Sequence, residues 1–198
     1  MTTIHALVLA AGAASRFGSP KGLAHYRGRP LIRQVVESVQ AAFNPLSNAD
    51  TVTVILGSEF ERLRDTLSGC NVRIVINPEW QRGLSSSIRV GIRALPSSTS
   101  AVLMALADQV LVRVDDYRRL IEAAIANPDS PIAARYAEAI GVPAVFPARY
   151  FTRLCTLEGD RGAGSLLLAD ERVVAIDIPN AAFDIDTPEQ LAKVNQGR

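Results

Sequence analysis

The sequence predicts an α/β fold, a three-layer α/β/α arrangement around a mostly parallel sheet. Short, nearly continuous runs of Val, Ile and Leu indicate strands that are buried on both faces, as in a parallel sheet. Segments with apolar residues at helical spacing alternate with these runs, and this alternation places helices on both sides of the sheet. The strand-like runs are residues 4–9, 52–56, 72–76 and 101–106.

Helices are expected between and after these strands. One follows Pro30, which suits a first helical turn, and another begins at Thr187 and Pro188, a typical N-cap followed by a proline. A third starts after Gly83 with three serines and continues to Leu95. In two of the segments the helical spacing is carried by Leu31, Ile32, Val35, Val36 and Val39, and by Tyr117, Leu120, Ile121, Ala124 and Ile125.

The composition limits the size and the partners of the protein. A chain of 198 residues fits one domain, residues 1–198, and its 48% hydrophobic and 21% charged residues are typical of a soluble globular protein. The formal net charge of +1 leaves no surplus of Lys and Arg for nucleic acid or an anionic membrane. We therefore expect neither a nucleic-acid partner nor a membrane partner.

Two further features concern location and redox chemistry. The first apolar run is too short to span a bilayer and follows no positively charged segment, so we expect a cytoplasmic protein. Cys70 and Cys155 lie far apart, without another Cys or His at metal-ligand spacing. We therefore expect neither a zinc site nor a disulfide framework.

The loop after the first expected strand has the composition of a phosphate-binding loop. Glycine lets backbone N–H groups approach an anion closely, and Arg16 and Lys21 supply positive charge. The spacing matches neither the dinucleotide-binding G-x-G-x-x-G pattern nor the Walker loop. We expect a different kind of nucleoside triphosphate site, in which the loop contributes Ala10, Ala11, Gly12, Ser15 and Gly18.

Three aspartates are candidate ligands for Mg²⁺. Asp108 directly follows the fourth expected strand, and the carboxyl ends of parallel strands are where ligands bind in such folds, so Asp108 can meet the glycine loop there. Asp184 and Asp186 lie two residues apart, and an extended segment places such residues on the same side. A helix cap at Asp108 and solvated loop acids at the other two positions are the alternative interpretations.

Two other segments are candidates for binding the substrates. Ser85, Ser86 and Ser87 lie at an expected helix N-terminus, where their hydroxyl groups either donate to a ligand or cap the helix. Asp160 lies in a glycine-rich turn before the apolar residues 166–168. A helix beginning there would present its N-terminus to a phosphate, whereas an ordinary acidic turn would not.

These segments together resemble one known family. Residues 10–21 are similar to the A-A-G-x-S-x-R-x-G-x-x-K signature of the nucleotidyltransferases related to molybdenum cofactor cytidylyltransferase, a family that includes the guanylyltransferases of the same cofactor. Further segments that match this family, in the right order, are 77–91, 106–109, 157–163 and 184–191. The resemblance covers nearly the whole chain and implies a Rossmann-like nucleotidyltransferase fold.

The resemblance also implies roles for individual residues. Lys21 would neutralise the triphosphate as pyrophosphate leaves, and Arg16 would contact the β and γ phosphates. Asp186 would bind Mg²⁺ together with Asp108, with Asp184 in support. The segment 85–87 would contact the base or ribose, and the region of Asp160 would border the pterin of the acceptor.

The function implied is the Mg²⁺-dependent transfer of CMP from CTP to the terminal phosphate of a molybdopterin-type cofactor, with release of pyrophosphate. A client molybdoenzyme would be a further partner. The sequence Ala10-Ala11-Gly12 is similar to the cytidylyl branch. The guanylyl branch tends to have a second glycine there, so this chain has one more methyl group near the base. Such a methyl group discriminates between a purine and a pyrimidine by only about 1–3 kcal/mol, so the use of GTP remains open.

Three positions depart from the family pattern on the acceptor side. The family commonly has Pro, His and Arg where this chain has Val110, Val142 and Gly164. These departures leave the acceptor open. A sugar or polyol phosphate is one alternative acceptor, and a non-catalytic protein that binds nucleotide or cofactor is an alternative function.

Overall fold

A seven-stranded sheet forms the centre of the computed structural model, which describes residues 2–13, 17–18, 20–43 and 51–196. The strand order is β5-β4-β1-β6-β8-β7-β9. Only β8 runs antiparallel to its neighbours in this sheet, so the prediction of a mostly parallel sheet is confirmed. The strands are β1 (Ile4–Ala10), β4 (Val52–Leu56), β5 (Arg73–Ile76), β6 (Ala101–Leu106), β7 (Ile132–Tyr136), β8 (Ala139–Pro147) and β9 (Val174–Asp177).

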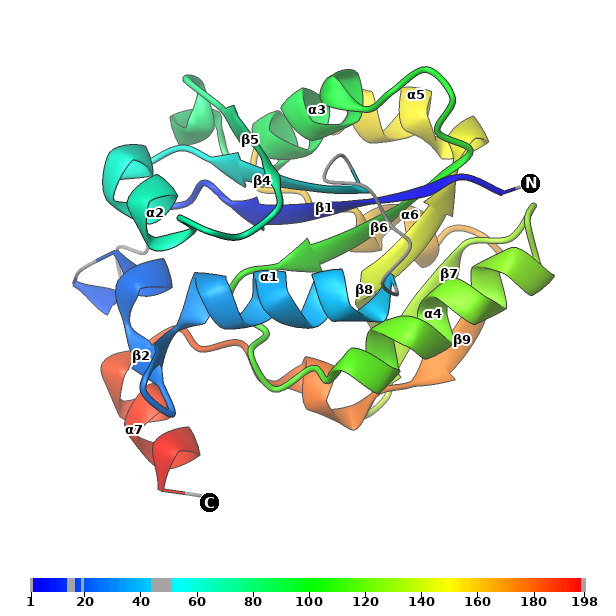
Figure 1. The fold of residues 1–198 in the computed structure, drawn as a ribbon. Helices are drawn as coiled ribbons and strands as arrows, with labels where there is room; N and C mark the ends of the chain where they lie inside the picture. Colours follow the sequence, from blue (N-terminus) through cyan, green and yellow to red (C-terminus); the bar gives the residue numbers. More distant parts are fainter. Residues whose placement is uncertain (1, 14–16, 19, 44–50, 197–198) are drawn as a thin grey trace.

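Helices cover both faces of this sheet (Figure 1). On one face lie α1 (Leu31–Ala42) and α4 (Val114–Ala126), which also pack against each other. On the other face lie α3 (Leu84–Ala94), α5 (Phe151–Cys155) and the single turn α6 (Gly164–Leu167). The helix α2 (Phe60–Thr66) packs beside β4, and short 3₁₀ turns occur at Lys21–Leu23 (η2), Trp80–Arg82 (η4), Ala148–Tyr150 (η5) and Pro179–Ala182 (η6).

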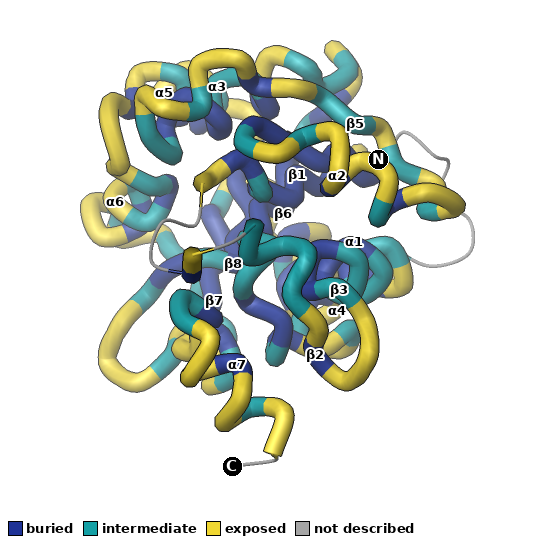
Figure 2. The backbone as a smooth tube through the Cα atoms, turned by 90° about the vertical axis from the view of Figure 1, so that its left-hand side faces the viewer, coloured by how far each residue is buried: buried dark blue, intermediate teal, exposed yellow. Residues whose placement is uncertain are grey.

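The two faces of the sheet bury separate hydrophobic cores. Alternation along β1 sends Val8 into the core beneath α1 and α4, and Leu7 into the core beneath α3 and α5. The runs that predicted strands are nearly continuous because both faces are covered. The dark blue strands in the middle of Figure 2 show this double burial.

The C-terminal segment returns to the beginning of the chain. Thr187 caps α7 (Pro188–Asn195) as predicted, and Gln190 completes a capping box. The side chain of Asn195 then accepts a hydrogen bond from the Arg27 N–H and donates one to the His25 carbonyl. It thereby holds α7 against the hairpin formed by β2 (His25–Tyr26) and β3 (Arg29–Pro30), as Figure 2 shows.

None of the helices within the described ranges combines the length and the apolar character needed to cross a lipid bilayer. Cys70 and Cys155 are both free thiols with intermediate exposure. Burial raises the pKa of each.

Candidate functional site

The site lies where the strand order changes direction. From β1 the chain passes through α1 to β4 on one side of β1, whereas the later strand β6 pairs with its other side. In open α/β sheets a crevice forms at such a point, beyond the carboxyl ends of the strands. The loop that begins at Ala10 and the residue Asp108 both occupy this edge.

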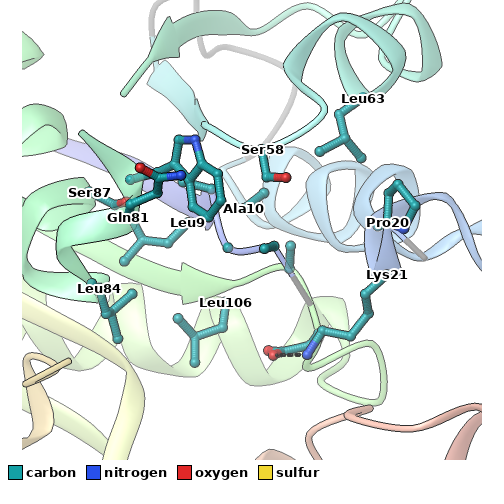
Figure 3. A pocket seen from close by; sticks show the side chains of 18 of the residues that line it. Leu9, Ala10, Pro20, Lys21, Ser58, Leu63, Gln81, Leu84, Ser87 and Leu106 are labelled. Carbon is teal, nitrogen blue, oxygen red and sulfur yellow. Dashed lines mark hydrogen bonds and ion pairs between the residues drawn. The ribbon is translucent and has the colours of Figure 1, made fainter. Parts of the chain in front are cut away.

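A cleft of about 410 Å³ opens at this edge (Figure 3). Its size suits a nucleotide, because pockets for small molecules span roughly 300–1,000 Å³. Gln81, Leu84 and Ser87 lie on one side of it and Pro20 and Lys21 on the other. The lining also includes Ala10, Ala11, Gly12, Ser58, Trp80, Asp108 and Asp160.

Lys21 joins two carboxylates at the edge of this cleft. Its Nζ lies 2.7 Å from Asp108 Oδ2 and 2.9 Å from Asp186 Oδ1. All three side chains are partly shielded from solvent, with exposed fractions of 18%, 21% and 30% in that order. Burial alone would lower the pKa of Lys21, but the charges and hydrogen bonds of the two carboxylates outweigh it and raise that pKa.

The third predicted carboxylate lies beside this pair. Partial burial raises the pKa of Asp184, and the negative charges of Asp108 and Asp186 raise it further. A hydrogen bond with the Gln109 side chain and the positive charge of Lys21 oppose that rise. The structure therefore brings Asp108, Asp184 and Asp186 together from the middle and the end of the chain.

Ile185 explains why both C-terminal aspartates face the same way. Its side chain is only 1% exposed and packs in the core beneath α1 and α4. Its N–H donates to the carbonyl of Asp108 at 3.1 Å. Because neighbouring side chains of an extended segment alternate, burying Ile185 turns Asp184 and Asp186 to the opposite side.

This arrangement fits a divalent cation. Mg²⁺ binds through one or two carboxylates together with phosphate oxygens and water, and Asp108 and Asp186 already share one cation. The other oxygen of Asp108, Oδ1, is buried and finds no hydrogen-bond donor among the described residues. A buried carboxylate oxygen without a donor is costly, and a cation would satisfy it. Within the described ranges, no group of three or more His, Cys, Asp or Glu side chains has metal-binding geometry.

The three serines at the start of α3 differ in their surroundings. Ser86 donates to the carbonyls of Glu79 and Gly83, which is a structural role, and Ser85 is buried outside the cleft lining. Ser87 lines the cleft and accepts a hydrogen bond from Asn77 Nδ2 at 3.0 Å. Of the three, Ser87 is the one placed to meet a ligand in the cleft.

Asp160 reaches the cleft because two loops pack closely. Gly83 has a φ of +92°, and a Cβ at this position would lie 2.5 Å from the Gly159 carbonyl and 2.6 Å from Asp160 Oδ1. Only glycine permits this contact. Arg89 holds the same loop from α3 by donating to the carbonyls of Cys155 and Leu157. The helix expected after Asp160 is the four-residue turn α6, too short for a substantial helix dipole.

The remaining predicted residues have varied positions. Ser15 and Arg16 lie outside the described residues. Gly18 has a φ of +72° and is exposed, away from the cleft lining. Val110 is buried in the core beneath α1 and α4, and Gly164 begins α6. Arg82, in contrast, pairs with Glu79 on the surface.

Sequence reasoning missed several residues of the cleft. Ser58, Trp80 and Gln81 line it, and none was predicted to bind. Gly57 was the available signal, because it directly follows the buried strand β4 at the ligand-binding edge. A Cβ at Gly57 would lie 2.6 Å from both the Ala11 carbonyl oxygen and Trp80 Cβ. This glycine lets the loop after β1 pack against the tryptophan.

Comparisons with known proteins agree with this geometry. Residues 6–173 match the model of the MobA-like NTP transferase domain. Nicotine blue oxidoreductase from Paenarthrobacter nicotinovorans is 30% identical over 202 residues, which cover 95% of this chain and 94% of that protein.

Solved structures share the fold over nearly the whole chain. Rv0371c from Mycobacterium tuberculosis H37Rv superposes with a TM-score of 0.83 at 26% identity, covering 98% of both chains. The structure of its complex with manganese superposes with a TM-score of 0.80 at 24% identity, covering 100% of both chains. Molybdopterin-guanine dinucleotide biosynthesis protein A from Archaeoglobus fulgidus gives 0.71 at 16% identity, covering 97% of both. Because the matched segment includes β1, β6 and the cleft between them, the chain belongs to the MobA-like NTP transferase domain family, a family of nucleotidyltransferases.

Proposed function

We propose that this protein transfers CMP from CTP to the terminal phosphate of a molybdopterin-type cofactor and releases pyrophosphate. The observation that carries the proposal is the cluster of Lys21, Asp108 and Asp186 at the edge of a nucleotide-sized cleft. In this reaction an oxygen of the acceptor phosphate forms a bond to the α-phosphorus of CTP. The bond from that phosphorus to the bridging oxygen breaks, and the electron pair leaves with pyrophosphate.

The residues of this chain would bind and position the charged groups. The backbone of Ala10, Ala11 and Gly12 borders the cleft at the carboxyl end of β1, where N–H groups can approach phosphate oxygens. Lys21 would balance the negative charge that accumulates on the departing pyrophosphate, and Arg16 would contact the β and γ phosphates. Positioning and charge stabilisation are the main contributions a protein makes to phosphoryl chemistry.

Asp108 and Asp186 would hold the divalent cation, with Asp184 supporting them. A bound Mg²⁺ would polarise the phosphoryl oxygens and help to orient the two substrates. The buried, donor-free Oδ1 of Asp108 supports this assignment, as does the manganese complex of the similar Rv0371c. We infer Mg²⁺ as the physiological ion because it favours carboxylate and phosphate oxygens.

The proposal names a specific nucleotide donor, CTP, and a specific phosphate acceptor, a molybdopterin-type cofactor. The sequence Ala10-Ala11-Gly12 supports CTP, whereas the similarity to a molybdopterin-guanine protein keeps GTP as an alternative donor. That same similarity supports the molybdopterin-type acceptor. Val110, Val142 and Gly164 keep a sugar or polyol phosphate as an alternative acceptor.

The test is a matrix of donors and acceptors. Purified protein is incubated with Mg²⁺ and CTP, GTP, ATP or UTP, together with molybdopterin cofactor, sugar phosphates or polyol phosphates, and pyrophosphate release is measured. Release with CTP and the molybdopterin-type cofactor alone supports the proposal. Turnover only with another pair overturns the donor or the acceptor, and nucleotide binding without pyrophosphate indicates an accessory protein. The Asp108→Asn variant controls for contaminating activity.

A second candidate function is an oxidoreductase reaction. The observation that favours it is the 30% identity to nicotine blue oxidoreductase over 95% of this chain. We rank it second because a lysine held between two carboxylates suits phosphate and cation chemistry better than electron transfer. Following the absorbance of NADH and NADPH with redox dyes as acceptors tests it. Oxidation that survives Asp108→Asn, with no pyrophosphate release from any donor, would favour the oxidoreductase.

A further inference from the structure

Gln109 connects three distant segments of the chain beneath the carboxylates. It follows Asp108 and is only 2% exposed. Its Nε2 donates to the carbonyl of Val142 in β8 and to the carbonyl of Ala181 in η6, both at 3.1 Å. These acceptors lie 33 and 72 residues away along the chain.

Packing alone does not explain why a buried position holds the amide of Gln109. Its Oε1 is buried and has no hydrogen-bond donor among the described residues. Burying a polar atom without a partner is unfavourable, and an apolar side chain of the same length would avoid that cost. The retained amide is therefore explained by the hydrogen bonds that its N–H groups donate, to the Val142 and Ala181 carbonyls and to the Asp184 side chain.

One of these acceptors, the Ala181 carbonyl, begins the segment that carries Asp184 and Asp186. Gln109 fixes the start of this segment through the Ala181 carbonyl, and the carbonyl of Asp108 fixes its middle through the Ile185 N–H. The Gln190 side chain fixes its end by accepting from the N–H groups of Asp186 and Thr187. Gln109 is thus the side-chain link between the end of β6 and the tail that brings the second carboxylate.

We propose that Gln109 is a positioning residue for the cation site, which holds the segment 181–186 so that Asp184 and Asp186 face Asp108. The proposal rests on the proposed function in that these carboxylates bind the divalent ion. Residues that orient metal ligands without touching the metal commonly matter almost as much as the ligands themselves. No contact of Gln109 with either substrate is required.

The experiment compares two isosteric substitutions at opposite ends of β6. Gln109→Met removes the hydrogen bonds to the Val142 and Ala181 carbonyls and the one to the Asp184 side chain, and it keeps the side-chain length. The control is Thr99→Val, which removes a buried hydrogen bond to His5 at the amino end of the same strand. For each variant the melting temperature, the amide hydrogen exchange of a peptide covering 181–187, and Mn²⁺ binding by electron paramagnetic resonance are measured, with and without a non-hydrolysable CTP analogue.

We expect Gln109→Met to weaken Mn²⁺ binding by about 10–100-fold, the range typical of residues that support metal ligands. Exchange in the 181–187 peptide should accelerate in this variant and stay at the wild-type rate in Thr99→Val. Wild-type exchange and wild-type Mn²⁺ affinity in Gln109→Met would overturn the proposal, and so would equal changes in both variants. If Gln109→Met does not fold, Gln109→Leu removes the same donors without adding a carboxyl group beside Asp184.

The outcome separates this inference from the proposed function. Wild-type protein that binds no Mn²⁺ would contradict the cation site, while hydrogen exchange in the 181–187 peptide would still test the positioning role. Conversely, pyrophosphate release with unchanged exchange in Gln109→Met would retain the proposed function and reject the role of Gln109.

Discussion

The Lys21 Nζ lies 2.7 Å from Asp108 Oδ2, so a side chain of the protein occupies the place beside this carboxylate that a cation would take. The same nitrogen contacts Asp186. A divalent ion that bridges the two carboxylates must compete with the lysine. The phosphates of an incoming nucleotide offer Lys21 an alternative partner, so the nucleotide and the ion should bind more strongly together than separately.

The first prediction concerns Lys21→Met. Removing the competing charge should strengthen Mn²⁺ binding to the nucleotide-free protein by at least about tenfold, equivalent to about 1.4 kcal/mol. It should also reduce turnover, because the charge on the leaving pyrophosphate is no longer balanced. Mn²⁺ titration by electron paramagnetic resonance measures the first effect. The matched control is Lys193→Met, at the other lysine of the chain, which is exposed on α7. Unchanged or weaker Mn²⁺ binding in Lys21→Met would contradict the competition.

The second prediction concerns Asp108→Asn. The substitution keeps the shape of the side chain but removes the charge, so we expect turnover to fall by at least about a hundredfold, as when one preorganised electrostatic contact is lost. Circular dichroism and thermal unfolding should show a retained fold. Asp115→Asn, at an exposed position on α4, is the control. Wild-type turnover of Asp108→Asn at saturating Mg²⁺ would remove Asp108 from the cation site.

The third prediction separates stability from nucleotide binding at Gly12. A Cβ at this position meets no atom within 4 Å, and its φ lies outside the left-handed region. Gly12→Ala should therefore leave the free energy of unfolding within about 0.5 kcal/mol of the wild type. The added methyl group should nevertheless hinder the approach of the phosphates and raise the KM for the nucleotide by about tenfold, or about 1.4 kcal/mol.

Gly164→Ala serves as the comparison for Gly12→Ala. Its Cβ also meets open space, but Gly164 lies at the start of α6, outside the cleft lining. Its nucleotide KM should stay at the wild-type value. A wild-type nucleotide KM in Gly12→Ala would show that the phosphates do not approach this part of the loop.

The fourth prediction concerns stability in acid. Hydrogen bonds from Arg172 and from the Tyr150 hydroxyl lower the pKa of Asp170 well below its ordinary value. A carboxyl with a lowered folded-state pKa stabilises the protein fully above its unfolded pKa, about 3.9, and loses this contribution as the pH falls toward the folded-state pKa. Asp170→Asn should therefore lower the melting temperature at neutral pH, and the difference from wild type should shrink in acid.

Melting temperatures measured from about pH 7 to about pH 3 test this prediction. Asp129→Asn is the control, because the Asp129 side chain is 94% exposed and its contact with Arg149 is long, at 3.9 Å. A difference between wild type and Asp170→Asn that stays constant down to the acid end would show that the ionised carboxylate contributes nothing to stability.

The sequence predicted the central strands well because their burial is visible in the residues themselves. The strands β1, β4 and β6 consist mostly of Val, Ile, Leu and Ala and are buried, as strands covered on both faces are, whereas β5 is an edge strand that was predicted although its residues are only partly buried or exposed. The later strands carry weaker signals. β8 contains Gly141, Pro143 and Pro147, residues that ordinarily argue against a strand, and β9 is only partly buried.

The site was predictable as a set of residue types and less so as a geometry. The glycine loop and Asp108 follow buried strands, so their position at one sheet edge could be inferred. The contact between Asp186 and Lys21 depends on where Ile185 packs into the core, and the spacing of residues in the sequence does not reveal that position. Asn77 donates to both Ser86 and Ser87, so the difference between them depends on the orientation of α3, which points the Ser86 hydroxyl at the Glu79 carbonyl outside that helix.

Lys21 meets partners that lie 87 and 165 residues further along the chain. A chain still emerging from the ribosome therefore has Lys21 and the loop after β1 long before it has Asp186. The cluster can assemble only after translation has passed Asp186. During synthesis, binding of a metal–nucleotide complex should consequently begin late and abruptly. Its onset would mark a chain whose folding is nearly complete.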